Sequence, residues 1–275
     1  MSGRVYLIGT PIGNLGDLSD RARRTLGEVD LLAVEDTRRA RTLLRHAGID
    51  RPMVSLFEGN ERERTEELLA RLRDGVVLGL LTDAGMPAIS DPGFRLVRAC
   101  VEEGIDVRVV PGPSAATSAL VVSGLPVDRF TFEGFLPRRS SERRARLRSL
   151  ADDPRTLIVF ESPRRLAGLL RDVVEELGDR RVAVARELTK LHEEVLRGHA
   201  TEVLRRVGDG VRGEVTVVIE GARRPEAPSL EELVEEAAEL VALGRRKREA
   251  AAVVARERGG SANEIYEALV RRPSH

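Results

Sequence analysis

Short apolar segments alternate with amphipathic segments through residues 1–125, and this alternation constrains the fold more than any other feature of the chain. Caps mark the helical segments. Asp91 before Pro92 is a candidate N-cap, and Phe94, Val97 and Val101 then fall on one helix face. The alternation predicts an α/β domain with a mostly parallel sheet. Its strands are expected at residues 5–9, 31–35, 54–56, 76–81 and 107–110.

The pattern restarts near Gly124-Leu125-Pro126 and predicts a second α/β domain over residues 126–224. Residues 191–198 can pair with the strand before them, which would make this second sheet mixed. Pro225 and Pro228 indicate a linker, and capping-box sequences at Ser229 and Ser261 predict a small helical appendage within residues 225–275. Further strands are expected at 130–135, 156–160, 182–187 and 215–219, and helices near 141–151 and 164–177.

Composition limits the class of protein. Hydrophobic residues make up 41% of the 275 residues and charged residues 33%, which is typical of a globular protein, and no apolar stretch approaches the roughly 18 residues of a membrane span. The single cysteine, Cys100, excludes an intramolecular disulfide, favours the reducing cytoplasm and falls on an apolar helix face, where we expect it to be buried. The four histidines lack the spacing of zinc ligands, so we expect no metal site.

Turns rich in glycine, proline and acidic residues follow four of the five predicted strands of the first domain. Open α/β sheets bind ligands at the carboxyl ends of their strands, so these turns are the candidate site. The first turn has neither the dinucleotide motif nor the phosphate-loop motif, which argues against NAD, kinase and NTPase functions. The alternative at each turn is that its residues only shape the chain or cap a helix. The turns are residues 9–16, 35–38, 82–93 and 111–114.

Read together, these turns and several later segments resemble the tetrapyrrole methylase superfamily and, within it, the ribosomal RNA small subunit methyltransferase I family. The match runs in order through most of residues 4–220. Met86 stands where threonine is expected, and Arg164 where histidine is expected. The segments that carry the resemblance are LIGTPIGNL at 7–15, EDTR at 35–38, DAGMPAISDPG at 83–93, PGPS at 111–114, EGFLP at 133–137, ESP at 161–163 and RELTK at 186–190.

The resemblance implies two α/β domains with S-adenosylmethionine in the cleft between them, and usually a homodimer. It further implies 2′-O-methylation of a cytidine ribose in the decoding centre of 16S rRNA, on naked RNA or on the 30S subunit. A sulfonium methyl donor is already activated, so no metal is required. The expected cofactor contacts are Gly9, Thr10, Pro11, Gly13, Asn14, Glu35, Asp36, Asp83, Ala84, Gly85, Pro87, Ile89, Pro111, Gly112 and Ser114.

Transfer to a ribose hydroxyl invites a general base, although orientation of the two reactants should contribute more to the rate than the base does. Lys190 is the first candidate, because it is one of only two lysines in an arginine-rich chain and a desolvated lysine can lose its proton. Glu187 is the second. The alternative is that both are surface groups at the end of a strand.

Arginines concentrate between Pro137 and Arg148, although the net charge of the chain is zero. A solvated helix face would normally mix signs, so we predict that this segment contacts RNA phosphates. The basic cluster at Arg245 to Arg248 is weaker evidence for RNA contact, because acidic side chains of the preceding helix could form ion pairs with it. Aromatic residues at 3%, with no tryptophan, argue against base stacking as the main mode of recognition. The expected phosphate contacts are Arg138, Arg139, Arg143, Arg144 and Arg146, with Arg148 completing the segment.

Two rival functions remain at this point. One is a sister enzyme that methylates a small tetrapyrrole, which would need neither the arginine segment nor the appendage. The other is a non-catalytic nucleic-acid-binding protein whose appendage is a helix-turn-helix. The appendage is under a fifth of the chain, however, and the elaborate turns lie elsewhere.

Overall fold

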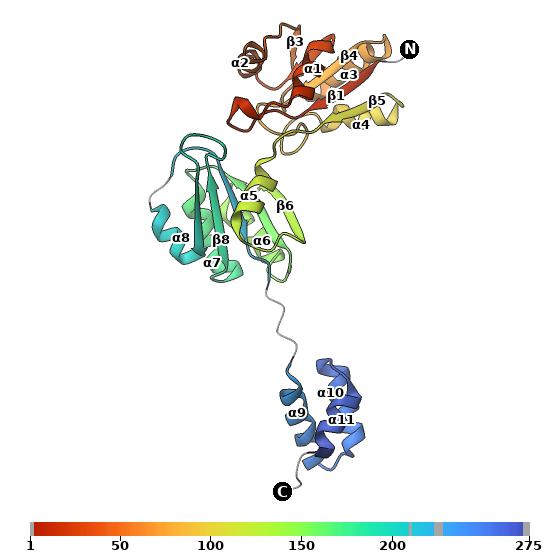
Figure 1. Cartoon of the computed structure of the whole chain (residues 1–275), viewed down its shortest axis with the longest axis vertical. Coiled ribbons are helices and arrows are strands. Elements are labelled where there is room, and N and C mark those ends of the chain that lie inside the picture. Colours follow the sequence, from red (N-terminus) through yellow and green to blue (C-terminus); the bar gives the residue numbers. More distant parts are fainter. Residues whose placement is uncertain (1–2, 209–210, 223–227, 272–275) are drawn as a thin grey trace. The chain divides into compact units, whose positions relative to one another are not determined.

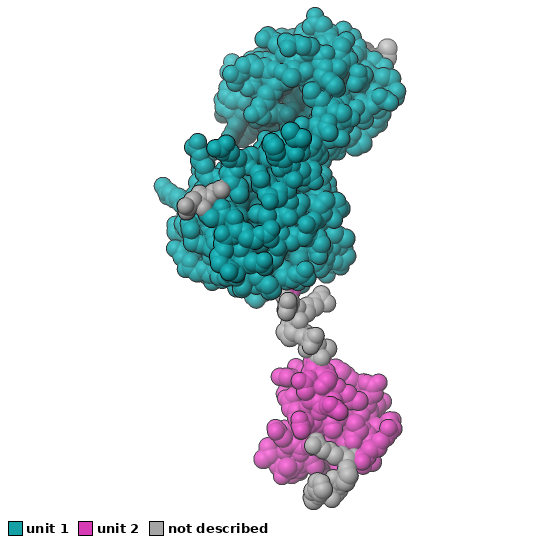
Figure 2. All heavy atoms as spheres, turned by 60° about the vertical axis from the view of Figure 1, so that its left-hand side comes forward, with its two compact units in different colours: residues 1–221 teal, residues 222–275 magenta. Residues whose placement is uncertain are grey.

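Two five-stranded sheets form the centre of the molecule in this computed structural model, which describes residues 3–208, 211–222 and 228–271. The chain divides into two compact units, residues 1–221 and 222–275 (Figure 2). Both sheets belong to the first unit, and the described residues of the second unit form three helices (Figure 1). The α/β class and the helical appendage predicted from the sequence are both confirmed.

The first sheet is parallel throughout, with the strand order β3-β2-β4-β1-β5. Helices α1 (Asp20–Glu28) and α2 (Thr37–Ala47) pack on one face, and α3 (Glu61–Arg73) and α4 (Phe94–Glu102) pack on the other. Since all five strands run the same way, the turns that follow them meet at one edge of the sheet. The strands are β1 (Arg4–Ile8), β2 (Leu31–Val34), β3 (Met53–Ser55), β4 (Val77–Leu81) and β5 (Asp106–Val110), and a short 3-10 helix, η1 (Leu15–Asp17), follows β1.

Helix α4 differs from its prediction in where it begins. It begins at Phe94 with Gly93 at the N-cap, and the carboxylate of Glu61 accepts hydrogen bonds from the backbone N–H groups of Gly93 (2.9 Å) and Arg95 (3.2 Å). Glu61 from α3 therefore caps this helix, and Asp91 does not. The buried side chains are Leu96 and the predicted Cys100, whereas the face that carries Phe94 and Val101 is exposed.

The second sheet is mixed, with the order β6-β7-β10-β8-β9. Strands β6 (Phe130–Phe135) and β7 (Thr156–Glu161) are parallel, and β10 (Val215–Ile219) runs antiparallel to both of its neighbours. Strand β9 (Glu194–His199) pairs antiparallel with β8 (Arg181–Arg186), as the sequence predicts. One face is covered by α6 (Ser140–Ser149), α7 (Leu166–Leu177) and α8 (Ala200–Val207).

Helix α5 (Ala115–Ser123) covers the other face of the second sheet. Its Ala116, Ala119 and Leu120 pack against Ile158 on β7 and Val218 on β10. The predicted division at residue 125 assigned this helix to the first domain, because it follows the fifth strand directly in sequence. Contacts with the second sheet place it there instead, so the turn that leads into α5 is the chain's passage from one sheet to the other.

The second unit contains α9 (Leu230–Ala242), α10 (Lys247–Arg258) and α11 (Ala262–Arg271) around a small core that includes Leu233, Val254 and Ile265. The predicted capping box is present: the Ser229 side chain accepts from the backbone of Glu232, whose carboxylate accepts from the backbone of Ser229. Pro225 lies outside the described residues. Among the described helices, none has the length and apolar character needed to span a bilayer.

Candidate functional site

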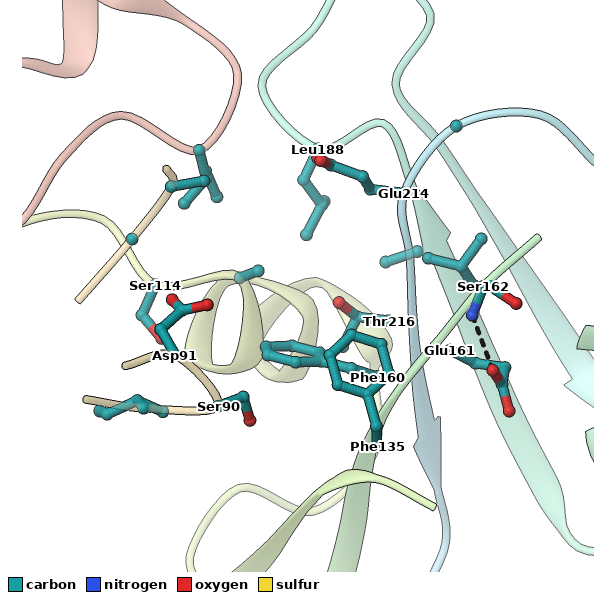
Figure 3. Close-up of a pocket in the computed structure, with 18 of the residues that line it drawn as sticks. Ser90, Asp91, Ser114, Phe135, Phe160, Glu161, Ser162, Leu188, Glu214 and Thr216 are labelled. Carbon is teal, nitrogen blue, oxygen red and sulfur yellow. Dashed lines mark hydrogen bonds between the residues drawn. The ribbon is translucent and has the colours of Figure 1, made fainter. Parts of the chain in front are cut away.

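A cavity of about 380 Å³ lies in the first unit, where the turns at the edge of the first sheet meet strand ends of the second sheet. The first sheet contributes Ile12 and residues from the turn after β4, and Ala115 is the first residue of α5. The turn after β5 contributes Ser114 (Figure 3). The second sheet contributes side chains at the ends of β6, β7, β8 and β10. A volume of this size lies within the usual range for small-molecule sites.

The turn between β4 and α4 is held in an unusual backbone conformation. Gly85 and Gly93 have positive φ angles of 85° and 123°, and Ala88 and Ser90, which are not glycine, also have positive φ angles of 67° and 62°. Positive φ is unfavourable for residues with a Cβ, and such strain concentrates at functional sites. Four of the expected cofactor residues line the cavity, namely Ala84, Gly85, Ile89 and Ser114.

Backbone contacts bind the other turns to this one. Thr10 exchanges two backbone hydrogen bonds with Gly85, at 2.9 and 3.2 Å. A Cβ on Gly112 would lie 2.7 Å from the backbone carbon of Gly9, so the turns after β1 and β5 can approach this closely only with glycine at both positions. Thr10, Gly9 and Gly112 do not line the cavity, and neither do the expected contacts Pro11, Gly13, Asn14, Pro87 and Pro111.

The acidic residues Glu35, Asp36 and Asp83 line a separate hollow of only about 20 Å³. They link the turns after β2 and β4: Asp83 accepts from the backbone of Asp36 (3.2 Å), and Glu35 accepts from the backbone of Asp83 (3.3 Å). Burial raises the pKa of Glu35 and of Asp83, whereas hydrogen bonds with Arg38 lower the pKa of Asp36 to about 2. Asp36 also caps α2, which was the alternative considered for this turn.

Lys190 is fixed in an ion-pair cluster beside the cavity. Its Nζ donates to Oε1 of Glu187 (2.9 Å) and to Oε2 of Glu214 (3.0 Å), and Glu187 also accepts from the backbone of Glu214 (3.0 Å). Burial lowers the pKa of Lys190, but the hydrogen bonds with the two carboxylates outweigh it, and the net pKa is raised. A lysine that holds its proton more tightly is poorly suited to act as a base. Of these three residues only Glu214 lines the cavity.

Aromatic side chains form one wall of the cavity. Phe160 packs against Phe132 with ring centroids 4.9 Å apart and against Phe135 at 5.6 Å. Phe135 is 59% exposed, and both Phe135 and Phe160 line the cavity (Figure 3). Three of the six phenylalanines of the chain meet here, and the total number of aromatic residues in the sequence gives no sign of this cluster.

The arginine segment packs against acidic residues of α7 and β6. Arg143 is buried and pairs with Asp172 (2.6 Å), and Arg146 pairs with Glu133 (2.7 Å). The remaining pairs are Arg139 with Glu142 (3.4 Å), Arg144 with Glu175 and with Asp172 (3.9 Å), and Arg148 with Glu176 (2.9 Å). The arginine segment therefore does have acidic partners, but most of them lie about 30 residues away in sequence. Because Arg143 is buried in the core, its side chain cannot reach an RNA phosphate.

Comparison with known proteins gives consistent relatives. Residues 4–204 match the family of Tetrapyrrole (Corrin/Porphyrin) Methylases. The chain is 50% identical over 220 residues to ribosomal RNA small subunit methyltransferase I of Thermotoga maritima, covering 80% of this chain and 99% of that protein. It is 46% identical over 274 residues to the protein of the same name from Mycobacterium tuberculosis, covering 98% of this chain and 95% of that protein.

Solved structures share the two-sheet fold of the first unit. Uroporphyrin-III-C-methyltransferase from Thermus thermophilus superposes with a TM-score of 0.56 at 23% identity, covering 80% of this chain and 93% of that one. A structure of uroporphyrin-III C-methyl transferase from Thermus thermophilus complexed with S-adenyl homocysteine gives a TM-score of 0.56 at 22% identity, covering 79% and 97% of the two chains. The predicted tetrapyrrole-methylase fold is confirmed.

Proposed function

Because the chain belongs to the ribosomal RNA small subunit methyltransferase I family of tetrapyrrole methylases, we propose that it transfers a methyl group from S-adenosylmethionine to the 2′-oxygen of a cytidine ribose in the decoding centre of 16S rRNA. The observation that carries this proposal is the cavity between the two sheets, lined by the turns that the sequence marks as ligand-binding. The family relationship supports methylation of ribosomal RNA, and the nucleotide and the 2′-oxygen are the finer part of the proposal.

The residues present fit the cofactor. Ala84 and Gly85 leave room beside a backbone that a ligand can approach, and Ile89 and Leu188 provide apolar surface. Ser114 stands at the N-cap of α5 with no side-chain capping bond, so free N–H groups and the helix dipole there suit the carboxylate of the amino-acid part. S-adenosylmethionine supplies a methyl group on a positively charged sulfur. The protein's task is to hold the acceptor hydroxyl in line with it and to exclude water.

Lys190 and Glu187 retain a role in this proposal as positioning residues. Their ion pairs hold Glu214 at the rim of the cavity, and Lys190 also lies against the turn after β1, where a Cβ on Gly13 would come within 2.6 Å of its Cγ. The cluster therefore joins strand ends of the second sheet to a turn of the first. This interpretation replaces the proton-accepting role that the sequence suggested for Lys190 and Glu187.

Recognition of RNA is assigned to arginines that are free to reach phosphates. Arg138 is exposed and makes no ion pair with any described residue, and the Arg139 side chain is 82% exposed. Arg245, Arg246 and Arg248 at the start of α10 are exposed and have no acidic partner among the described residues. The buried Arg143 is excluded from the phosphate contacts, and Arg144 and Arg146 are only secondary candidates, because each already has a carboxylate partner.

The cellular location and the oligomeric state of the protein belong to the same proposal. The proposal places the protein in the cytoplasm, and the single, buried cysteine is consistent with a reducing compartment. A homodimer is the arrangement that the family resemblance implies, and the exposed apolar side chains of Phe94 and Val101 on α4 support a contact surface there. Light scattering on the purified full chain measures the oligomeric state directly.

Calorimetry with S-adenosylhomocysteine, followed by methyl transfer to 30S subunits, naked 16S rRNA and a porphyrinogen, tests the function. Nuclease digestion and mass spectrometry of the labelled RNA then locate the methyl group on a ribose or a base. Transfer to the porphyrinogen alone would favour the small-tetrapyrrole rival, and failure to bind S-adenosylhomocysteine would contradict the cofactor assignment.

Gly85→Val is a specific test of the cavity. Valine is β-branched and strained at a φ of 85°, and its side chain would occupy space beside Ile12, so we expect binding of S-adenosylhomocysteine to be abolished while circular dichroism is retained. Gly104→Val is the matched control. Gly104 also has a positive φ, of 68°, but has open space around its Cβ position and does not line the cavity. Equally impaired binding in both variants would count against the cavity.

A further inference from the structure

The side chain of Phe135 is the exposed part of the aromatic wall of the cavity. Phe135 is 59% exposed, whereas Phe160, which also lines the cavity, is half-buried. The two ring centroids are 5.6 Å apart, so Phe160 supports part of the Phe135 ring and the rest faces open space. An aromatic ring gains free energy when another ring covers it. The uncovered ring of Phe135 is therefore available to stack on a ligand in the cavity.

A bulge in β6 turns Phe135 toward the cavity. Side chains alternate between the two faces of a strand, so in a regular strand Phe135 would lie on the face opposite to Phe132. The pairing of β6 with β7 shifts by one residue between Phe132 and Gly134, where Gly134 has a positive φ of 60°. Beyond the shift Phe135 pairs with Phe160, just as Phe132 pairs with Ile158, so both phenylalanines lie on one face. Bulges that redirect a side chain in this way are common beside active sites.

The segment that follows Phe135 is fixed by a buried ion pair. The guanidinium of Arg165 donates to the backbone carbonyl oxygens of Leu136 (3.0 Å) and Pro137 (3.1 Å). The same guanidinium pairs at 3.0 Å with Glu161, whose side chain is buried at the end of β7. Because these contacts already hold the segment in place, a ligand that stacks on Phe135 does not first have to order it.

Arginines without carboxylate partners border this segment. Arg138 follows Phe135 by three residues, and Arg164 precedes Arg165; both are exposed, and neither forms an ion pair with a described residue. Strands β6 and β7 are parallel neighbours, so the segments that follow them leave the same edge of the sheet. An aromatic ring near guanidinium groups offers a surface for a base together with cations for phosphates. This combination is typical of sites that bind single-stranded nucleic acid.

We propose that Phe135 stacks on the base of the nucleotide whose ribose is methylated, while Arg138 and Arg164 bind neighbouring phosphates. This inference rests on the proposed function and names the residue that holds the acceptor nucleotide. A nucleotide that enters a cavity leaves the stack in its own strand, and Phe135 replaces the contacts that its base loses. Phe135 lies apart from Ser114 and Leu188, to which the cofactor is assigned, so the base and the cofactor can occupy different sides of the cavity (Figure 3). One stacked base is compatible with recognition that depends mainly on phosphates.

Phe135→Ala tests the proposal in single-turnover methyl transfer to 30S subunits. Loss of one stacked base should lower the rate at subsaturating 30S subunits by about tenfold or more, with affinity for S-adenosylhomocysteine unchanged. Phe135→Tyr keeps the ring and should keep most of the rate, which a loss of mere bulk would not explain. Phe130→Ala is the matched control: Phe130 is 41% exposed at the start of the same strand and does not line the cavity, so this variant should behave as the wild type.

The chain contains no tryptophan, which allows a second measurement that needs no activity. Phe135→Trp places a single indole ring in the wall of the cavity, and a base that stacks on an indole ring quenches its fluorescence. We expect naked 16S rRNA to quench this fluorescence and S-adenosylhomocysteine alone to leave it unchanged. In Phe130→Trp, the matched control, neither addition should quench the fluorescence.

Several outcomes would overturn the assignment of Phe135. An unchanged rate in Phe135→Ala, or no quenching of Phe135→Trp by 16S rRNA, would show that no base stacks there. Quenching by S-adenosylhomocysteine alone would assign the ring to the adenine of the cofactor, and quenching by a porphyrinogen in place of RNA would assign it to a small tetrapyrrole. A wild-type chain that methylates no RNA would contradict the proposed function, and the fluorescence of Phe135→Trp would still show separately whether an RNA base stacks on this wall.

Discussion

A buried ion pair joins α6 to α7 in the second half of the first unit. Arg143 and Asp172 have side chains that are each 8% exposed, their closest atoms are 2.6 Å apart, and the Ser140 hydroxyl donates to the same carboxylate. Removal of Arg143 leaves the buried carboxylate of Asp172 without water and with only the longer contact to Arg144, at 3.9 Å. We therefore expect Arg143→Ala to lower the free energy of unfolding by about 3–5 kcal/mol, measured by urea denaturation.

Arg139→Ala provides the comparison, because the Arg139 side chain is 82% exposed and its pair with Glu142 spans 3.4 Å. Exposed pairs contribute little to stability, so this variant should stay within about 0.5 kcal/mol of the wild type. Equal stability of the two variants would show that Arg143 is not buried as described. The contrast also explains a limit of sequence analysis. Neighbouring arginines look alike in the sequence, whereas burial and partners from a distant helix give them different roles.

Lys190 and Asp91 illustrate the same limit at the site. Rarity of lysine drew attention to Lys190, and it does lie beside the cavity, but its two carboxylate partners are three and 24 positions away in sequence. Asp91 preceded a proline and so resembled a helix cap. Only the position of Glu61, on a different helix, reveals that the cap is supplied from elsewhere. Residue type and local context predicted where the site lies, and long-range contacts determine which partners each of these side chains has.

Among elements, the turns after β1 and β5 depend on each other. Gly112→Ala would place a Cβ 2.7–2.9 Å from the backbone of Gly9, and a backbone cannot move aside as a flexible side chain can. We expect the two turns to separate and affinity for S-adenosylhomocysteine to fall by about tenfold or more, which corresponds to about 1.4 kcal/mol. Calorimetry measures this effect, and circular dichroism should report an intact α/β fold.

Gly27→Ala is the control for that change. Gly27 lies within α1, nothing lies within 4 Å of its Cβ position, and alanine should stabilise the helix by about 0.5–1 kcal/mol. Cofactor affinity should not change in this variant. If Gly112→Ala binds S-adenosylhomocysteine as tightly as Gly27→Ala does, the close approach of the two turns is not needed for the site.

Most strands and helices could be placed from the sequence to within a few residues, because the spacing of apolar residues and the capping residues of helices are local signals. The parallel first sheet, the antiparallel pairing of residues 194–199 and the capping box at Ser229 follow from such signals. The partner sheet of α5 could not be predicted in this way. Its small apolar residues fit either sheet, and the choice depends on how the two sheets are connected.

At the scale of the whole molecule, average composition concealed how residues are distributed. Aromatic residues are only 3% of the chain, yet Phe135 and Phe160 meet in one wall of the cavity. Net charge is zero, yet acidic residues of α9 and basic residues at the start of α10 are segregated within the second unit. The total number of aromatic or charged residues does not show where in the structure they cluster. Binding depends on such clusters, because they set the local surface and the local electrostatic field.

The start of α10 is therefore the place where we expect the second unit to contact RNA. Arg245, Arg246 and Arg248 are exposed and lack acidic partners among the described residues, and Arg248 lies over the ring of Tyr266 at 5.9 Å. Cations are unfavourable at a helix N-terminus, where the dipole attracts anions. Three arginines at such a position gain a favourable environment when phosphates bind, because each phosphate satisfies both the side chains and the helix end.

Replacement of Arg245, Arg246 and Arg248 by alanine in the full chain should weaken binding to 16S rRNA in a salt-dependent way. The slope of log affinity against log salt should flatten by roughly 0.7–0.9 for each phosphate that the variant no longer neutralises, while affinity for S-adenosylhomocysteine stays the same. The matched control replaces Arg144, Arg146 and Arg148, which also removes three charges but from side chains that already hold carboxylates. Its slope should change little. Titrations at three salt concentrations distinguish the two sites. If the α10 variant keeps the wild-type slope of log affinity against log salt while the slope of the control variant flattens, the phosphates are bound by α6 and its neighbours.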